Sequence, residues 1–199
     1  MKIHFFIILN WVIINLTIPV NSQYSSFINN DEVNHNECSL TKSIKIDPQD
    51  IYNNADLIID KIYLGNIRAA SNITWLIENN ISVIFNVASE WDSMAYNNNI
   101  ELFYFPLDDS NRLDMKDTRR FINKVTNKLI DTVIDNNMTN ILVHCNMGIS
   151  RSVTIVIRYL QMVYGMSYKE ALNYIKNIRP IVKPNTLFKR ILIGQDTDL

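Results

Sequence analysis

The segment His144–Ser152 places a cysteine and an arginine six residues apart, with one glycine between them. The planar guanidinium of Arg151 can grip two oxygens of a phosphoryl group, and Gly148 lets the backbone curl around that group. The positive charge of Arg151 also favours the thiolate of Cys145, because nearby cations and helix N-termini lower the pKa of a thiol. A thiolate beneath a bound phosphorus atom can attack in line and form a cysteinyl phosphate. These residue types therefore predict phosphoryl-transfer chemistry.

Taken singly, each of these residues has an ordinary structural explanation. Cys145 alone would be a buried apolar side chain, and His144 alone would be a hydrogen-bonded core histidine. Arg151 alone would be a surface cation, and Gly148 alone would mark a turn. Their combination in one short loop favours the functional interpretation.

The elements on either side of the loop support this interpretation. The apolar run Ile141–Val143 precedes it, and the long apolar run Val153–Tyr164 follows it. A strand, a tight loop and a helix in this order turn backbone N–H groups and the positive end of the helix dipole toward an anion. Residues 153–157 favour a strand by propensity, but the length of the run and Gly165 at its end predict a buried helix.

The remaining pattern alternates between strands and helices. We expect strands at residues 61–65, 81–87, 102–105 and 141–144, and helices at residues 71–80, 117–135, 167–178 and 185–192. Ser167 and Glu170 form a capping box that begins a helix, and Pro180 ends this helix. Asn185 can cap the last helix. The prediction is an α/β fold with a central, mostly parallel sheet flanked by helices, and a phosphate-binding loop between a strand and a helix.

Composition sets wider bounds. The chain has 199 residues, 47 % of them apolar, with a formal net charge of −1. These values fit one globular domain and give no sign of a nucleic-acid or membrane-surface binder. Cys38 and Cys145 are too few for a disulfide framework, and the three histidines lack metal-ligand spacing. We therefore expect no metal, no cofactor and no nucleic-acid partner.

The N-terminal 22 residues have the pattern of a secretory signal peptide. Lys2 precedes the largely apolar run Phe5–Val20, and Val20–Ser22 offers small residues at a cleavage-like position. A signal peptide would direct the protein into the secretory pathway, and its cleavage would leave no stable membrane insertion. An uncleaved anchor and a mis-assigned start codon are the alternatives. Residues 23–46 are polar and predict a flexible linker, so the catalytic domain is expected at residues 47–199.

The pattern His-Cys-x-x-Gly-x-x-Arg-Ser resembles the signature of the cysteine-dependent protein tyrosine phosphatases. Its ending, Gly148–Ser152, resembles the dual-specificity branch in particular. The likeness extends along the domain: Ile62–Asn66 and Ile81–Ala88 are similar to its opening, and Glu170–Arg179 with Pro184-Asn185 is similar to its closing segment.

This resemblance implies an enzyme that hydrolyses phosphotyrosine and phosphoserine/threonine in proteins through a cysteinyl phosphate, without a cofactor. Cys145 would be the nucleophile and Arg151 the phosphate clamp. Ser152 would hydrogen-bond the thiolate and help it leave, while His144 would orient the loop and tune the thiol. The backbone that would line the phosphate site belongs to Asn146, Met147, Gly148, Ile149 and Ser150.

The leaving oxygen also needs a proton, so a general acid is required. The family carries an aspartate on a loop upstream of the cysteine, and Phe105–Asn111 matches that loop with Asp109 in the acid's place. Asp108 is the neighbouring alternative. Asp114 and Asp117 are further candidates, although either would serve equally well as a helix N-cap.

Two alternative functions stay open. One is a phosphoresidue-binding module with little turnover, and the other is a phosphatase of RNA 5′-phosphates or phosphoinositides. Lipid phosphatases of this superfamily carry basic residues inside the loop, whereas Asn146, Met147 and Ile149 are neutral. Most relatives work in the reducing cytosol, which makes a cytoplasmic location the alternative to secretion. In an oxidising compartment a reactive Cys145 is liable to oxidation or to pairing with Cys38.

Overall fold

The computed structural model describes residues 8–9, 12–13, 54–90, 100–135 and 139–194. Strands β1 (Ile8–Leu9) and β2 (Val12–Ile13) pair antiparallel within a first unit, Met1–Ile44. The rest of the predicted signal peptide and the whole predicted linker lie outside the described residues. Within the described ranges, no helix combines the length and the apolar character needed to cross a membrane.

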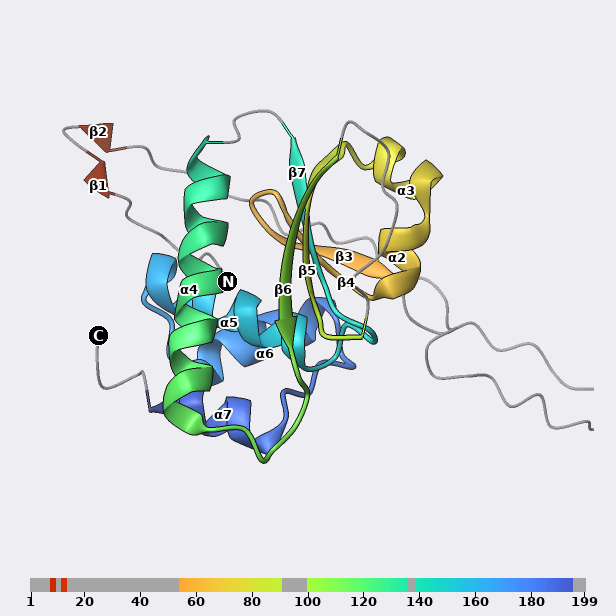
Figure 1. Ribbon diagram of the computed structural model, residues 1–199. Coiled ribbons are helices and arrows are strands. Elements are labelled where there is room, and N and C mark those ends of the chain that lie inside the picture. Colours follow the sequence, from red (N-terminus) through yellow and green to blue (C-terminus); the bar gives the residue numbers. More distant parts are fainter. Residues whose placement is uncertain (1–7, 10–11, 14–53, 91–99, 136–138, 195–199) are drawn as a thin grey trace, which may run out of the picture. The chain divides into compact units, whose positions relative to one another are not determined.

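The second unit, Lys45–Leu199, is built on a five-stranded sheet with the order β3–β4–β7–β5–β6 (Figure 1). Its strands are β3 (Ala55–Ile59), β4 (Ile62–Gly65), β5 (Ile81–Ala88), β6 (Glu101–Leu107) and β7 (Asn140–His144). The neighbouring strands β4, β7, β5 and β6 run parallel to one another. Strand β3 pairs antiparallel with β4 at the edge of the sheet. The predicted mostly parallel sheet is thus confirmed. Central strand β7 is buried on both faces, as its unbroken apolar run indicates.

Helices cover both faces of this sheet (Figure 1). The short helices α2 (Ile67–Ser71) and α3 (Ile73–Glu78) lie on one face, and α4 (Met115–Asp135), α5 (Arg151–Tyr164), α6 (Tyr168–Ile178) and α7 (Thr186–Ile193) lie on the other.

Strand alternation divides the apolar residues between these two layers. Neighbouring residues of a strand point to opposite faces, so Ile84 packs in the small cluster with Leu76 of α3. The next residue, Phe85, packs in the large cluster with Val125 of α4 and Leu160 of α5. In the described part of this unit, the sheet therefore separates two apolar clusters, a large one and a small one.

Two parts of the sheet and helix pattern differ from the sequence-based expectation. Strand β3 was not expected, and it becomes a strand by pairing with β4 at the sheet edge. The helix expected over residues 71–80 corresponds to α3, and the short helix α2 that precedes it was not expected. The side chain of Asn66 accepts a hydrogen bond from Ala69 N, and that of Asn72 accepts one from Trp75 N, both at 3.1 Å. Each asparagine begins a helix of its own because it satisfies N–H groups that the first turn leaves unpaired.

Helix α5 confirms the prediction made against β propensity. Every residue from Arg151 to Gln161 is buried, so the helix is surrounded by protein on all sides over this length. It ends at Gly165, whose φ of +63° is the left-handed conformation that closes a helix. Burial in the middle of the domain outweighs the preference of its β-branched residues for strands.

Candidate active site

The parallel strands bring the chemistry-bearing residues to one edge of the sheet. At the carboxyl end of β7, His144 is in register with Gly65 of β4 and Asn86 of β5. The chain leaving β5 carries Glu90 to this edge, and the chain leaving β6 carries Asp109. Carboxyl ends of parallel strands form the usual binding crevice of such sheets, so the topology assembles a site here.

Cys145 sits at the base of the loop that connects β7 to α5 and is 2 % exposed. Its Sγ accepts hydrogen bonds from Gly148 N and from Ser152 Oγ, each at 3.3 Å. Gly148 has a φ of +66°, and a Cβ at this position would lie 2.6 Å from the carbonyl oxygen of Gly65. The curled loop therefore requires glycine both for its backbone conformation and for its packing against β4.

The carbonyl oxygens of this loop are bound outward by the surrounding scaffold. Ile67 N donates to Asn146 O at 3.1 Å, Arg179 Nε donates to Gly148 O at 3.1 Å, and Lys183 N donates to Ile149 O at 2.8 Å. In a trans peptide the C=O and N–H groups point in opposite directions. Because the carbonyl groups of Gly148 and Ile149 point outward, the N–H groups of Ile149 and Ser150 point toward the inside of the loop.

A pocket of about 320 Å³ opens above Cys145. Its lining comprises Asp109, Cys145, Met147, Ile149, Ser150, Arg151, Lys183 and Asn185. Three residues predicted from sequence to act in catalysis, Cys145, Arg151 and Asp109, therefore meet in one pocket. Ser152 is fully buried beside the sulfur and His144 is fully buried at the end of β7. Both lie outside the pocket lining.

The competing aspartates lie elsewhere. Asp108 is exposed and is not part of the pocket lining. Asp114 accepts a hydrogen bond from Asp117 N at 2.8 Å through Oδ1, so it caps the start of α4. Asp117 forms an exposed ion pair with Arg120 at 2.7 Å. The N-cap interpretation therefore holds for Asp114.

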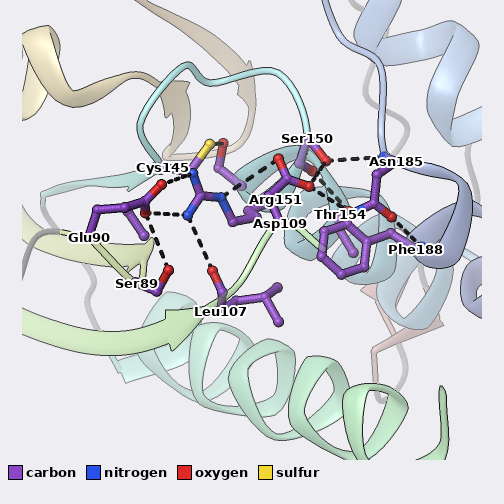
Figure 2. A network of polar contacts seen from close by, with 12 residues as sticks. Ser89, Glu90, Leu107, Asp109, Cys145, Ser150, Arg151, Thr154, Asn185 and Phe188 are labelled. Atoms are coloured by element: carbon purple, nitrogen blue, oxygen red, sulfur yellow. Dashed lines mark hydrogen bonds and ion pairs between the residues drawn. The ribbon is translucent and has the colours of Figure 1, made fainter. Parts of the chain in front are cut away.

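Glu90 forms an ion pair with the guanidinium of Arg151 (Figure 2). Its Nη1 and Nη2 donate to the two carboxylate oxygens of Glu90, the Nη2–Oε1 distance being 2.9 Å, and Nη1 also donates to Leu107 O at 3.3 Å. The hydrogen bond to Arg151 lowers the pKa of the Glu90 carboxyl. Burial works against the charge on Arg151, but the bond to Glu90 and the nearby Cys145 raise the pKa of the guanidinium overall.

One edge of the Arg151 guanidinium remains available. Its Nε is buried, makes no hydrogen bond to any described residue, and lies 3.8 Å from Asp109 Oδ2. A buried donor without a hydrogen bond carries a desolvation cost, which an incoming oxyanion would reduce. The arrangement thus leaves a donor for an anionic oxygen beside the pocket.

Asp109 has two unequal carboxylate oxygens. Its Oδ1 accepts hydrogen bonds from Ser150 Oγ at 2.8 Å and from Asn185 Nδ2 at 2.7 Å (Figure 2). Ser150 Oγ in turn accepts from Asn185 N at 3.1 Å. The other oxygen, Oδ2, faces Arg151 Nε, so the side chain is oriented by one oxygen and leaves the second for the pocket.

His144 carries no positive charge at neutral pH. It is fully buried, and its Nδ1 lies 3.3 Å from the carbonyl oxygen of Cys145, which can only accept. Burial lowers the pKa of the imidazole from 6.5 to about 4. The neutral ring therefore binds the loop backbone through Nδ1–H and places no cation beside the sulfur.

Three members of the site were missed by sequence reasoning: Glu90, Lys183 and the side chain of Asn185. Glu90 had a usable signal, because it is an acidic residue just beyond the buried strand β5, at the edge where Arg151 was expected. Asn185 was assigned only as the cap of α7, and it does accept a hydrogen bond from Phe188 N at 2.9 Å. Nothing in the local sequence indicates that its amide also reaches Asp109.

Comparison with known proteins gives a consistent picture. The family model of the dual specificity phosphatase catalytic domain matches residues 62–197. The chain is 31 % identical over 166 residues to dual specificity protein phosphatase 1 of Arabidopsis thaliana, covering 82 % of this chain and 80 % of that protein. It is 34 % identical over 145 residues to human protein phosphatase Slingshot homolog 1, covering 68 % of this chain and 12 % of that protein.

A solved structure extends the likeness to three dimensions. The Yvh1 phosphatase domain from Chaetomium thermophilum is similar with a TM-score of 0.61 at 25 % identity, covering 71 % of this chain and 94 % of that chain. The chain spans only 12–20 % of the length of the mammalian Slingshot phosphatases that it matches. The similarity to those proteins therefore concerns a single domain.

Proposed function

Because the chain belongs to the dual-specificity phosphatase family, we propose that it hydrolyses phosphotyrosine and phosphoserine/threonine in proteins through a cysteinyl phosphate. The observation that carries this proposal is the pocket above Cys145, which also contains Arg151 and Asp109. A nucleophile, an anion clamp and a proton donor within one pocket are the groups that hydrolysis of a phosphate monoester requires.

Substrate binding uses charge and backbone dipoles. The phosphoryl oxygens would accept hydrogen bonds from the inward N–H groups of the loop and from Arg151 Nε, which has no other hydrogen-bond partner among the described residues. Helix α5 begins at Arg151, so the positive end of its dipole would also attract the phosphoryl group. This binding would hold the phosphorus atom above the sulfur of Cys145.

The first chemical step forms an S–P bond and breaks the P–O bond to the substrate. The thiolate of Cys145 supplies the electron pair, and Asp109 gives the proton on Oδ2 to the departing oxygen, which leaves as an alcohol or phenol. Asp109 lines the pocket and its Oδ1 already accepts two hydrogen bonds, which leaves Oδ2 for the proton and supports this assignment. Asp108 lacks such a position because it does not line the pocket.

The second step releases inorganic phosphate. Asp109, now a carboxylate, accepts a proton from water as the water oxygen attacks phosphorus and the S–P bond breaks. Cys145 leaves as a thiolate, which the hydrogen bonds from Gly148 N and Ser152 Oγ would stabilise. His144 would contribute by binding the loop backbone as a neutral ring.

We further infer that the catalytic domain occupies residues 47–199, behind a linker at residues 23–46 and a signal peptide at residues 1–22. The apolar run Phe5–Val20 and the small residues after it support secretion. A cytoplasmic location is the alternative. N-terminal sequencing of the protein purified from its own cells separates them: a chain that begins at Gln23 supports secretion, and one that retains Met1 contradicts cleavage.

Steady-state kinetics of the full chain on phosphotyrosine and phosphothreonine peptides tests the proposed activity. We expect turnover that disappears in Cys145→Ser, while the variant still binds the phosphopeptide. A wild-type protein that binds the peptides without cleaving them would identify a binding module instead. Faster hydrolysis of a phosphoinositide or of an RNA 5′-phosphate in the same panel would reassign the substrate class.

A further inference from the structure

Lys183 is a cation at the pocket whose charge the proposed mechanism does not use. The pocket lining contains two basic residues, Arg151 and Lys183. Arg151 is paired with Glu90, whereas the Lys183 side chain makes no hydrogen bond or ion pair with any described residue. Lys183 is therefore a basic residue of the pocket lining that no described carboxylate contacts.

The backbone of Lys183 is fixed against the phosphate loop. Its N–H donates to Ile149 O at 2.8 Å, and its neighbours Val182 and Pro184 are buried. On either side, Arg179 Nε binds Gly148 O at 3.1 Å and Asn185 N binds Ser150 Oγ at 3.1 Å. The segment from Arg179 to Asn185 thus runs alongside the loop and holds the Lys183 backbone at the pocket, while the side chain is exposed.

We propose that Lys183 forms a second anionic subsite, which binds a negatively charged substrate residue next to the phosphoresidue in the pocket. This proposal rests on the proposed phosphatase function and names the preferred substrate class: phosphopeptides with an acidic or a second phosphorylated residue nearby. The shared chemistry is an anionic oxygen that accepts hydrogen bonds from an ammonium group.

The distances available to the substrate support this reading. Successive residues of an extended peptide are spaced by about 3.3–3.6 Å, so flanking side chains lie within roughly 10 Å of the phosphoresidue. A lysine has a flexible four-carbon stem and can direct its ammonium group to several such positions. Lys183 is therefore suited to detect a charge without fixing one peptide register.

The neutral residues of the loop explain why the charge of Lys183 matters. Met147 and Ile149 line the same pocket and offer no charge to a flanking residue. Met147 is 41 % exposed, so the loop side of the pocket is apolar where a peptide would pass. Discrimination between an acidic and a neutral flanking residue would then depend on Lys183.

The test compares peptides within each variant. We would measure kcat/KM for phosphotyrosine peptides that differ only in Glu, Gln or Lys at each flanking position, and for the doubly phosphorylated peptide. An exposed ion pair of ordinary strength predicts that the wild type prefers Glu over Gln by about two- to fivefold. The preference should lie in KM and shrink at high salt, because free ions screen exposed charges.

Variants of Lys183 decide whether this residue is responsible. Lys183→Met keeps the stem and should lose the preference, and Lys183→Glu should invert it toward Lys. Lys189→Glu is the matched control, because Lys189 is an exposed residue of α7 outside the pocket lining and the net charge changes equally. Ratios of two peptides within one variant cancel any common effect on the phosphate pocket.

The outcomes separate the two proposals. A wild type that cleaves all peptides equally, or a preference that survives in Lys183→Met, overturns the subsite but leaves the phosphatase function standing. A wild type that cleaves neither the peptides nor p-nitrophenyl phosphate contradicts the phosphatase function. Peptide binding to Cys145→Ser, with and without Lys183→Met, then decides the subsite. A Lys183-dependent preference confined to phosphoinositides or RNA 5′-diphosphates also overturns the peptide subsite.

Discussion

Asn185 Nδ2 donates a hydrogen bond to Asp109 Oδ1 over 2.7 Å, although the two residues are 76 positions apart in the chain. Ser150 Oγ donates to the same oxygen at 2.8 Å. With two donors on Oδ1, a proton carried by Asp109 belongs on Oδ2, the oxygen that lies toward Arg151. Asn185 is therefore positioned to orient the proposed general acid.

This relationship predicts a selective defect in Asn185→Ser. Serine preserves the cap of α7, because serine and asparagine are equally good N-caps, but its shorter side chain lacks the amide that reaches Asp109. We expect kcat to fall about tenfold on alkyl phosphates, which need proton donation, and by less on p-nitrophenyl phosphate. The measurement is kcat across a series of leaving groups, and an equal loss on every ester would count against an orienting role.

Glu90→Gln should weaken phosphate binding. The bidentate carboxylate fixes the plane of the Arg151 guanidinium and leaves Nε toward the pocket. An amide supplies one acceptor and no charge, so we expect kcat/KM to fall about three- to tenfold. The modest size reflects the 47 % exposure of the Glu90 side chain.

Inhibition by inorganic phosphate measures the Glu90 effect directly. Glu78→Gln is the matched control, since Glu78 is an exposed acid at the end of α3 outside the pocket lining. Tighter phosphate binding in Glu90→Gln would be the contrary result. Such a result would mean that Glu90 competes with phosphate for Arg151 and does not position the guanidinium for phosphate binding.

Gly148→Ala should damage both stability and phosphate binding. An added Cβ would lie 2.6 Å from Gly65 O and 2.9 Å from Arg179 Nη2, and the backbone would keep a φ of +66°. We expect the free energy of unfolding to fall by at least about 2 kcal/mol, from left-handed strain together with the clash.

Gly165→Ala separates strain from packing. Gly165 has a nearly identical φ of +63°, but nothing lies within 4 Å of its added Cβ. Urea denaturation should therefore show a loss of about 1 kcal/mol from backbone strain alone. Equal losses in the two alanine variants would show that packing against β4 is unimportant.

His144 makes the domain sensitive to acid. Burial lowers its pKa from 6.5 to about 4, so the unfolded chain binds a proton more readily than the folded one between these values. The stabilisation is fully present above pH 6.5 and is lost as the pH falls toward 4, amounting to about 3 kcal/mol. Unfolding free energies at pH 7 and pH 4.5 measure it.

His144→Asn isolates this contribution from that of the carboxylates. The variant has no titrating ring, so its loss of stability between pH 7 and pH 4.5 should be smaller by about 2 kcal/mol or more. A pH dependence identical to that of the wild type would mean that the imidazole is not buried in its neutral form.

Much of the fold was predictable from patterns in the chain. The apolar run Ile141–Val143 predicted a strand before the loop, and β7 is the central strand of the sheet. The capping box of Ser167 and Glu170 is present at the start of α6. Such features are local, because each depends on residues within a few positions of one another. Strand β3 was missed, since its pairing with β4 decides its conformation more than its own five residues do.

For the site, the sequence alone determined the loop. The types and spacing of Cys145, Gly148 and Arg151 specify a phosphate-binding loop because all three act within one turn of backbone. Only the tertiary structure decided which distant residues complete it: Glu90 behind Arg151, Asn185 against Asp109, and Lys183 at the pocket. These pairings depend on where parallel strands end and how α7 packs, because each of them joins residues far apart in the chain.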